Sequence, residues 1–177
     1  MTENKKLPVT ELDRFMPVWH FREYHSLRID APTEAVIQAA QEATWKEAPV
    51  ARFFLLFTRN EIKGETRILD QFAADGQTVL SVGGNEFVYG GIGSDEGPHQ
   101  PERPMAEAYR DFEEPGYTKV GFNVRYADGV LSSETRIYAT DTETRNRFGR
   151  YWMIIRGPSG LTRKALLKAI KQRVQAG

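Results

Sequence analysis

A β-hairpin that runs directly into a long basic helix, over residues 117–176, limits the fold of this chain more than any other feature. Asp128-Gly129 separates two strand-like runs, residues 117–126 and 130–140, and such a two-residue turn fixes the register of a hairpin. The register gives one mainly apolar face, which pairs Val124 with Ser133, Phe122 with Thr135, and Val120 with Ile137. The other face is polar and pairs Asn123 with Glu134 and Lys119 with Tyr138. The apolar face needs a covering layer, and we expect the following helix to supply it.

The helix after the hairpin carries one apolar arc and one basic side. Asp141 or Thr142 is suited to cap its N-terminus. The residues of the arc recur at three- and four-residue spacing and are Phe148, Tyr151, Trp152 and Ile155. Residues 157–160, Gly-Pro-Ser-Gly, are expected to interrupt or kink the helix because proline lacks a backbone donor. Beyond this point Leu166, Ile170 and Val174 lie on one side, and Lys164, Lys168 and Lys171 lie on the other.

The N-terminal third predicts an arm, a strand and two helices. Residues 1–19 show no sustained period, so we expect an arm without regular structure. Residues 25–30 alternate apolar and polar side chains and predict a strand, which Ala-Pro-Thr converts into a helix over 33–45. Residues 51–57 fit either a buried strand or a buried helix, and we favour the helix.

The middle of the chain reads as a meander of short strands. Asp75-Gly76 is interpreted as a hairpin turn between strands at 68–73 and 78–82, and residues 83–85 as a turn before a strand at 86–92. Residues 94–116 then form a long excursion, with a helical turn expected within 105–112. Excursions of this length are either binding loops or solvated insertions, and the sequence favours neither.

Composition limits the classes of protein to consider. A chain of 177 residues with 40% hydrophobic content is long enough for one core, so residues 20–177 are interpreted as a single domain. There is no cysteine, and no apolar run reaches the ~20 residues of a membrane span. We therefore expect a cytoplasmic protein. The 24 basic and 24 acidic residues balance, so we expect no nucleic-acid partner, and membrane contact is weighed only for the basic C-terminal helix.

The predicted order is a strand, two short helices, an antiparallel meander and a long C-terminal helix. This α+β order is the helix-grip arrangement, in which a curved sheet of about six or seven strands wraps the last helix. Four segments resemble the START-like superfamily, also called SRPBCC, and in particular its uncharacterised bacterial members. They are residues 25–36 (HSLRIDAPTEAV), 116–119 (GYTK), 133–137 (SETRI) and 145–152 (RNRFGRYW). The superfamily includes lipid-transfer domains and polyketide cyclases, and the resemblance, which spans residues 20–175, implies a ligand cavity between sheet and helix.

Residues on the predicted inward face are candidates for the wall of that cavity. They combine large aromatic groups with small or hydroxylic ones and comprise Phe87, Tyr89, Phe122, Val124, Ser133, Thr135, Ile137, Tyr151 and Trp152. The alternative interpretation is an ordinary packed core, because small groups opposite large ones either interlock or leave space.

A second candidate set is polar and comprises Glu86, Arg125, Glu134 and Arg136. These residues either orient a ligand and shuttle protons or form cross-strand ion pairs on the solvent face, and we favour the ion pairs. Ser159 does not fit a nucleophile elbow, and the three histidines do not form a metal site. We predict no metal or cofactor and assign no catalytic residue.

The first hypothesis for function is binding of a small apolar or amphipathic molecule in a cavity between the curved sheet and the last helix. The alternatives are an enzyme that resembles the polyketide cyclases and uses pocket Tyr, Arg or Glu residues, or a protein-interaction module. An exposed apolar patch on residues 94–116 would favour the interaction module. Ligand identity and oligomeric state lie outside what the sequence predicts.

Overall fold

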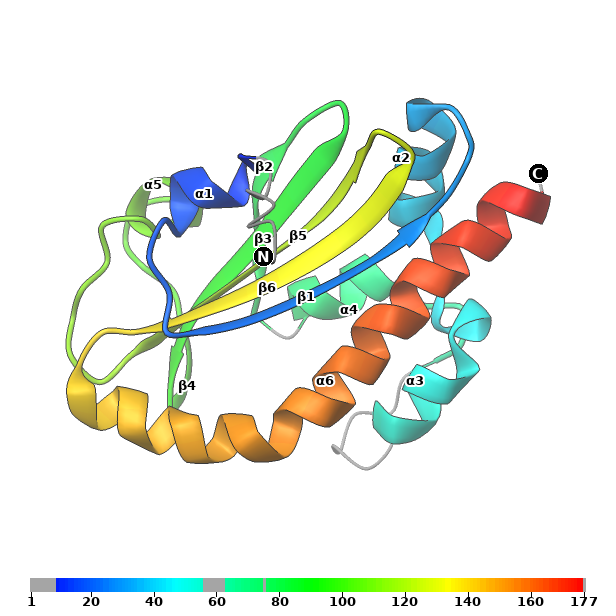
Figure 1. Cartoon of the computed structure of the whole chain (residues 1–177). Coiled ribbons are helices and arrows are strands. Elements are labelled where there is room, and N and C mark those ends of the chain that lie inside the picture. The colour runs from blue at the N-terminus through cyan, green and yellow to red at the C-terminus, as the bar shows by residue number, and fades with distance from the viewer. Residues whose placement is uncertain (1–8, 56–62, 75, 177) are drawn as a thin grey trace, which may run out of the picture.

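The computed structural model describes residues 9–55, 63–74 and 76–176 (Figure 1). The helices are α1 (Leu12–Phe15), α2 (Thr33–Glu42), the 3-10 turn η1 (Trp45–Glu47), α3 (Pro49–Leu55), α4 (Ile68–Ala74), α5 (Met105–Ala108) and α6 (Thr142–Ala176). The strands are β1 (Phe21–Arg28), β2 (Thr78–Val82), β3 (Glu86–Ser94), β4 (Gly97–His99), β5 (Thr118–Ala127) and β6 (Val130–Ala139). None of the described helices is long and apolar enough to cross a membrane.

Within the described residues the strands form one antiparallel sheet of six, in the order β1-β6-β5-β3-β2 with β4 beside β3. The sheet is curved, and α6 runs along it (Figure 1). This confirms the predicted α+β fold with a curved antiparallel sheet and a long C-terminal helix. The predicted hairpin register is confirmed as well, because Val124 pairs with Ser133 and Asn123 with Glu134.

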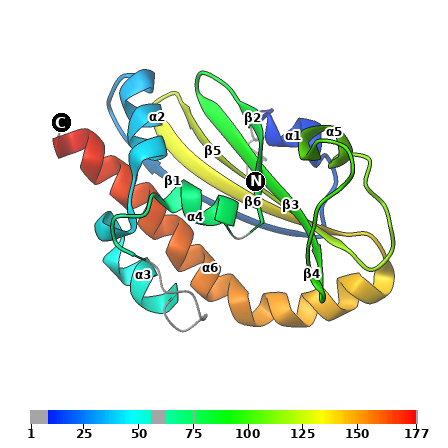
Figure 2. The same ribbon diagram turned by 180° about the vertical axis from the view of Figure 1, so that it is seen from behind.

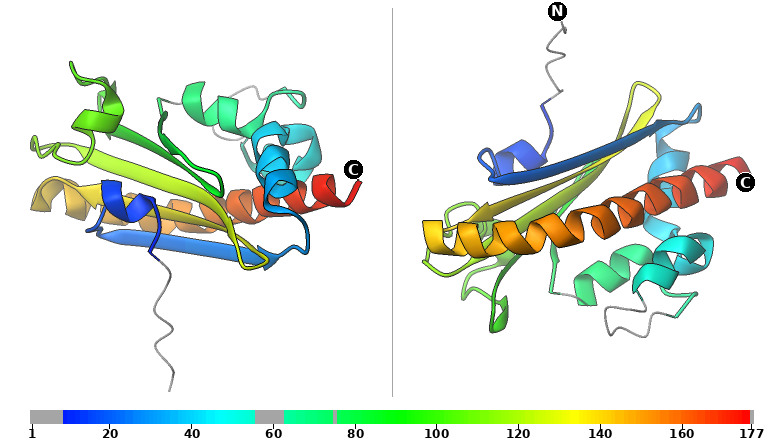
Figure 3. Two further views of the ribbon diagram at one scale, coloured as in Figure 1. Left: turned by 90° about the horizontal axis from the view of Figure 1, so that it is seen from above. Right: turned by 60° about the horizontal axis from the view of Figure 1, so that its bottom comes forward.

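Both faces of the sheet are covered, and each has its own core. The inward face packs against α2, α4 and the C-terminal half of α6, with Phe122, Val124 and Leu131 among its buried residues. The outward face packs against α1 and α5 in a smaller cluster that contains Leu12 and Tyr109. Figure 3 shows α1 and α6 on opposite sides of the sheet. The predicted inward face is therefore correct, and the outward face is not the solvent face that we expected.

Helix α6 continues through Gly157-Pro158-Ser159-Gly160, so the predicted interruption is wrong, although the helix curves along its length (Figure 1). Its C-terminal half is held by α2 and α3, which lie beside it in Figure 2. Leu166 and Ile170 are buried there, whereas Lys164 and Lys168 are exposed, as the spacing predicted.

The strand predicted at residues 68–73 is wrong, because this segment is helix α4. Gly76 has a φ of +86° and ends the helix, with its N–H donating to the carbonyl of Ala73. The next N–H, of Gln77, donates to the carbonyl of Phe72. These two hydrogen bonds form the Schellman motif of a helix C-terminus. The motif requires a glycine with positive φ, as a hairpin turn does, so the sequence signal is the same. The helix favoured for 51–57 is confirmed for residues 51–55, and 56–57 lie outside the described residues.

Residues 9–19 and 94–116 are more ordered than predicted. The described part of the arm contains the single-turn helix α1, which buries Leu12 on the outward face. The excursion contributes strand β4 and helix α5, and its large apolar residues Met105, Tyr109 and Phe112 are buried. The excursion therefore lacks the exposed apolar patch that would favour a protein-interaction module.

Candidate functional site

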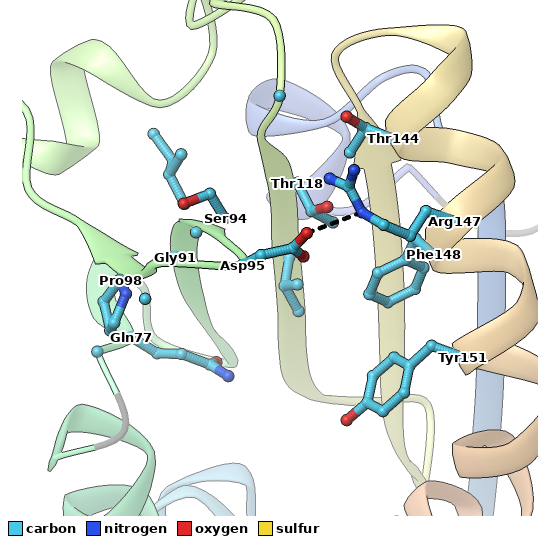
Figure 4. A pocket seen from close by; sticks show the side chains of 16 residues that line it. Gln77, Gly91, Ser94, Asp95, Pro98, Thr118, Thr144, Arg147, Phe148 and Tyr151 are labelled. Carbon is cyan, nitrogen blue, oxygen red and sulfur yellow. Dashed lines mark ion pairs between the residues drawn. The ribbon is translucent and has the colours of Figure 1, made fainter.

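A pocket of about 590 Å³ lies between the N-terminal half of α6 and strands β3, β4 and β5 (Figure 4). It is open to solvent and lies at the place where the helix-grip arrangement predicts a cavity. The side chains around it come from the sheet and the helix and include Gln77, Ser94, Asp95, Thr118, Val120, Thr144, Arg147, Phe148 and Tyr151.

The pocket exists because the inward face of β3 loses its side chains toward one end. Successive inward positions of this strand are Phe87, Tyr89, Gly91 and Gly93, since side chains alternate between faces. The two aromatic rings fill the space near the middle of the sheet, and the two glycines leave the floor of the pocket bare. Gly91 also lets Gly76 and Gln77 at the side of the pocket approach β3, because an added Cβ atom would lie 3.1 Å from the carbonyl oxygen of Gly76.

The helical wall is fixed at its start by Asp141, one of the two residues predicted as the cap. Its carboxylate accepts hydrogen bonds from the backbone N–H groups of Thr144, at 2.8 Å, and Gly116, at 2.6 Å. The Thr144 and Gly116 N–H groups lower the pKa of Asp141 to about 2. The cap joins the start of α6 to the residues just before β5, so the helix begins beside the edge of the pocket.

Two polar groups stand out among the residues around the pocket. Arg147 Nε lies 3.0 Å from Asp95 Oδ2, and this ion pair crosses the mouth from α6 to the β3–β4 turn (Figure 4). The Gln77 side chain points into the pocket, and its Oε1 atom is buried without a hydrogen-bond partner among the described residues. The pocket thus combines aromatic walls with a few oriented polar atoms.

The residues predicted as a cavity wall are divided between the pocket and the core. Tyr151 lines the pocket and is 55% exposed. Trp152 is buried instead and packs against Phe21, with ring centroids 6.1 Å apart. The other seven, Phe87, Tyr89, Phe122, Val124, Ser133, Thr135 and Ile137, are buried on the inward face of the sheet. Phe122 stacks on Tyr89 at 5.3 Å between centroids, so this part of the predicted wall is closely packed.

The predicted polar set forms a connected cluster on the outward face, under the arm. Arg136 Nε donates to Glu134 at 2.6 Å, and its guanidinium also pairs with Asp13 of the arm at 2.7 Å. Glu86 accepts from the side chain of Asn123, and its second oxygen accepts from the backbone N–H of Glu11. Glu86, Glu134 and Arg136 are each less than 5% exposed, so the expected solvent-face pairs are instead a buried network.

This placement bears on the polyketide-cyclase alternative. Its ionisable residues were expected inside the pocket, but Glu134, Arg136 and the partly exposed Arg125 lie on the opposite face of the sheet. Tyr89 is on the inward face, within the packed core. Desolvation by burial and the charge of Asp70 raise the pKa of Tyr89 above its ordinary value. None of these four residues lines the pocket.

Sequence reasoning missed a third polar group, on the inward face: Glu23, His25 and Arg163. Glu23 and His25 alternate with outward residues of β1, but that strand was predicted to begin only at residue 25. Arg163 precedes Lys164 in the part of α6 where the sequence predicted a basic side, yet it is 7% exposed. A signal was available in Gly160, because a glycine one turn before a charged residue allows a helix to approach a strand closely.

Comparisons with known proteins give no family. No protein-family model matches the chain, and no curated protein matches it at a significant level. One solved structure with a weak likeness is the quaternary ammonium Rieske monooxygenase CntA in complex with an inhibitor, at 10% sequence identity and a TM-score of 0.32. The likeness covers 89% of this chain and 40% of that chain, so this chain spans less than half of that protein. It carries no argument about function. The architecture itself is compatible with a helix-grip fold.

Proposed function

We propose that this chain binds a small amphipathic molecule in the pocket between α6 and the sheet, as a START-like protein. The observation that supports the proposal is the pocket of about 590 Å³ at that position. Ligand pockets have volumes of roughly 300–1,000 Å³, apolar walls and a few oriented polar groups. The pocket has each of these features.

The residues around the pocket suggest how such a molecule is held. The rings of Phe148 and Tyr151 offer apolar contact from α6, and Val120 with the glycine backbone of β3 offers it from the sheet. Gln77 lines the pocket, and its side-chain amide can hydrogen-bond a polar group of the ligand. The exposed Asp95–Arg147 pair contributes only about 0–1 kcal/mol, so a ligand can displace it at small cost.

A fluorescent probe tests the proposal. N-phenylnaphthylamine is uncharged and becomes fluorescent in apolar sites, so wild-type protein is expected to bind it saturably. Tyr151→Ala removes an aromatic wall and should weaken binding about tenfold. Met153→Ala is the matched control, because Met153 is on the same helix, is 76% exposed and does not line the pocket.

The result that supports the proposal is loss of affinity in Y151A with unchanged affinity in M153A. Absence of saturable binding to the wild type would overturn the proposal, and so would equal losses in both variants. Native mass spectrometry of the purified protein, compared with its denatured mass, then identifies the chemical class of any molecule that copurifies.

A further inference from the structure

The inward face of β1 and β6 carries a charged cluster beneath α6. Glu23 pairs across the strands with Thr135, and His25 pairs with Ser133. The Nε2 atom of His25 lies 2.9 Å from Glu23 Oε1. Helix α6 crosses directly over this pair at Gly160, where an added Cβ atom would lie 3.2 Å from His25 Nε2.

Arg163, one turn after Gly160, brings a guanidinium to the same place. Its central carbon lies 4.1 Å from the ring centroid of Phe122 and 4.7 Å from that of Phe72. Phe122 pairs with Thr135, so Arg163 lies over the strand positions that hold the cluster. Burial lowers the pKa of Arg163 to about 10, although the charge of Glu23 opposes this effect. Arg163 is therefore positively charged at neutral pH.

Four side-chain atoms of this cluster are buried and have no hydrogen-bond partner in the part of the chain that the structure describes. They are Glu23 Oε2, Ser133 Oγ, Thr135 Oγ1 and Arg163 Nη1. Buried polar atoms in proteins are almost always paired, and a buried charge without a partner is rarer still. Four such atoms within one group of neighbouring residues call for a partner beyond the described residues, and a bound molecule would supply one.

The cluster lies directly beyond the pocket. Val120 lines the pocket, and Phe122 is the next inward residue on the same strand, about 7 Å further along. On α6 the pocket wall ends at Tyr151 and the cluster begins at Gly160. Pro158 lies between them and removes one backbone hydrogen bond of the helix, which weakens it at that point. The four atoms are closed to solvent, so binding requires the helix to move there.

We propose that this cluster of Glu23, His25, Ser133, Thr135 and Arg163 binds the polar end of the ligand whose apolar body occupies the pocket. The proposal rests on the proposed function and adds the chemistry of the ligand. Glu23 Oε2 accepts a hydrogen bond, Arg163 Nη1 donates one, and the two hydroxyls do either. The charges of Glu23 and Arg163 offset each other. The matching group is uncharged and both donates and accepts, and a primary carboxamide is the simplest example.

Displacement of N-phenylnaphthylamine by two matched compounds tests this assignment. Decanamide has the donor and the acceptor, whereas methyl decanoate has the same chain length and an acceptor only. We expect decanamide to displace the probe from the wild type at a concentration about tenfold lower. Arg163→Met removes the donor that the acceptor of either compound uses, so it should weaken both compounds by a similar factor and leave the affinity for the probe itself unchanged.

Thr135→Val provides a second variant of almost unchanged shape, and it should reduce the preference for decanamide about threefold. It keeps the test decisive if R163M does not fold. Equal displacement of the probe from the wild type by both compounds would overturn the assignment and leave the four atoms as partners of internal water only. So would an R163M variant that binds both compounds as tightly as the wild type, or a T135V variant that keeps the full preference. If the wild type does not bind the probe at all, the proposed function fails instead.

Discussion

Two charged clusters lie on opposite faces of the same two strands, and they differ in how fully they are paired. On the outward face, Arg22 and Arg136 both donate to the carboxylate of Glu134. On the inward face, Glu23 and Arg163 each keep a buried atom without a partner. The two clusters use adjacent residues of the same strands, such as 22 and 23 or 134 and 135. The difference in pairing therefore comes from the segment that packs over each face.

The outward cover is the arm, which supplies complementary groups. Asp13 pairs with Arg136, the carbonyl of Met16 accepts from the same guanidinium, and the ring of Trp19 lies 4.1 Å from it. The inward cover is α6, which supplies a glycine and one arginine at the corresponding place. Complete pairing of the charged outward groups indicates a structural role, whereas the unpaired atoms of the charged inward groups call for a partner. We therefore assign the outward cluster to binding of the arm and the inward cluster to binding of a ligand.

The largest expected effect is on the two buried arginines. Arg136→Met should destabilise the protein by about 3 kcal/mol, because it leaves Asp13 and part of Glu134 without their partner. Arg163→Met should destabilise it by only about 1 kcal/mol, because Arg163 Nη1 has no partner to lose among the described residues, although the charge of Glu23 is then left unopposed. Denaturant unfolding of both variants measures the difference. Losses of equal size would show that Arg163 is as well paired as Arg136 and would remove the contrast.

A pair of uncharged residues gives the next effect. Asn123 is 2% exposed; its amide donates to Glu86 at 2.8 Å and accepts from the backbone N–H of Glu134 at 2.8 Å. Asn123→Leu leaves Glu86 and the backbone N–H of Glu134 without this hydrogen-bond partner and should lower the free energy of unfolding by about 2 kcal/mol. Thr135→Val should change stability by less than about 0.5 kcal/mol, since its hydroxyl has no partner to lose. Thermal and denaturant midpoints of the two variants test this, and a large loss in T135V would contradict the assignment of an unpaired hydroxyl.

The smallest expected effect is a pH dependence of the stability that Asp13 of the arm contributes. Burial raises the pKa of Asp13, but hydrogen bonds from the Thr10 backbone and from Arg136 outweigh this and lower it below the usual 3.8. A carboxylate whose pKa is lower in the folded state stabilises the fold at pH values above its pKa in the unfolded chain. This stabilisation is lost as the pH falls through its pKa in the folded state. The difference in the free energy of unfolding between wild type and Asp13→Asn should therefore be largest near neutral pH and should decrease below about pH 4. A difference that is constant from pH 7 to pH 3 would separate Asp13 from the outward cluster.

The fold was largely predictable because its strongest signals are local. Asp128-Gly129 set the register of β5 and β6, and alternation then identified which of their residues share a face. The error at α4 came from the same rule, because a glycine with positive φ ends a helix as readily as it makes a hairpin turn. A helical signal was present in this segment. Ile68, Leu69 and Phe72 are spaced as on one face of a helix, and they pack together in the inward core.

The candidate site was less predictable, because it depends on what packs over each face. Among the predicted wall residues, Tyr151 was placed in the pocket by helical spacing, but the floor is made by Gly91 and Gly93, which offer no side chain to recognise. The burial of Glu134 and Arg136 depends on an arm more than a hundred residues away in sequence. Neither effect leaves a local pattern.

The sequence by itself determined the curved antiparallel sheet, the register of its central hairpin and the long helix after it. These follow from periodicity and turn chemistry, which act over a few residues. Only the tertiary structure decided which charges are paired. The arm brings Asp13 to Arg136 on one face, while the close crossing of α6 at Gly160 brings Arg163 to Glu23 and His25 on the other. Burial and pairing are properties of contacts between distant segments, so the same strand carries a structural network on one face and a candidate site on the other.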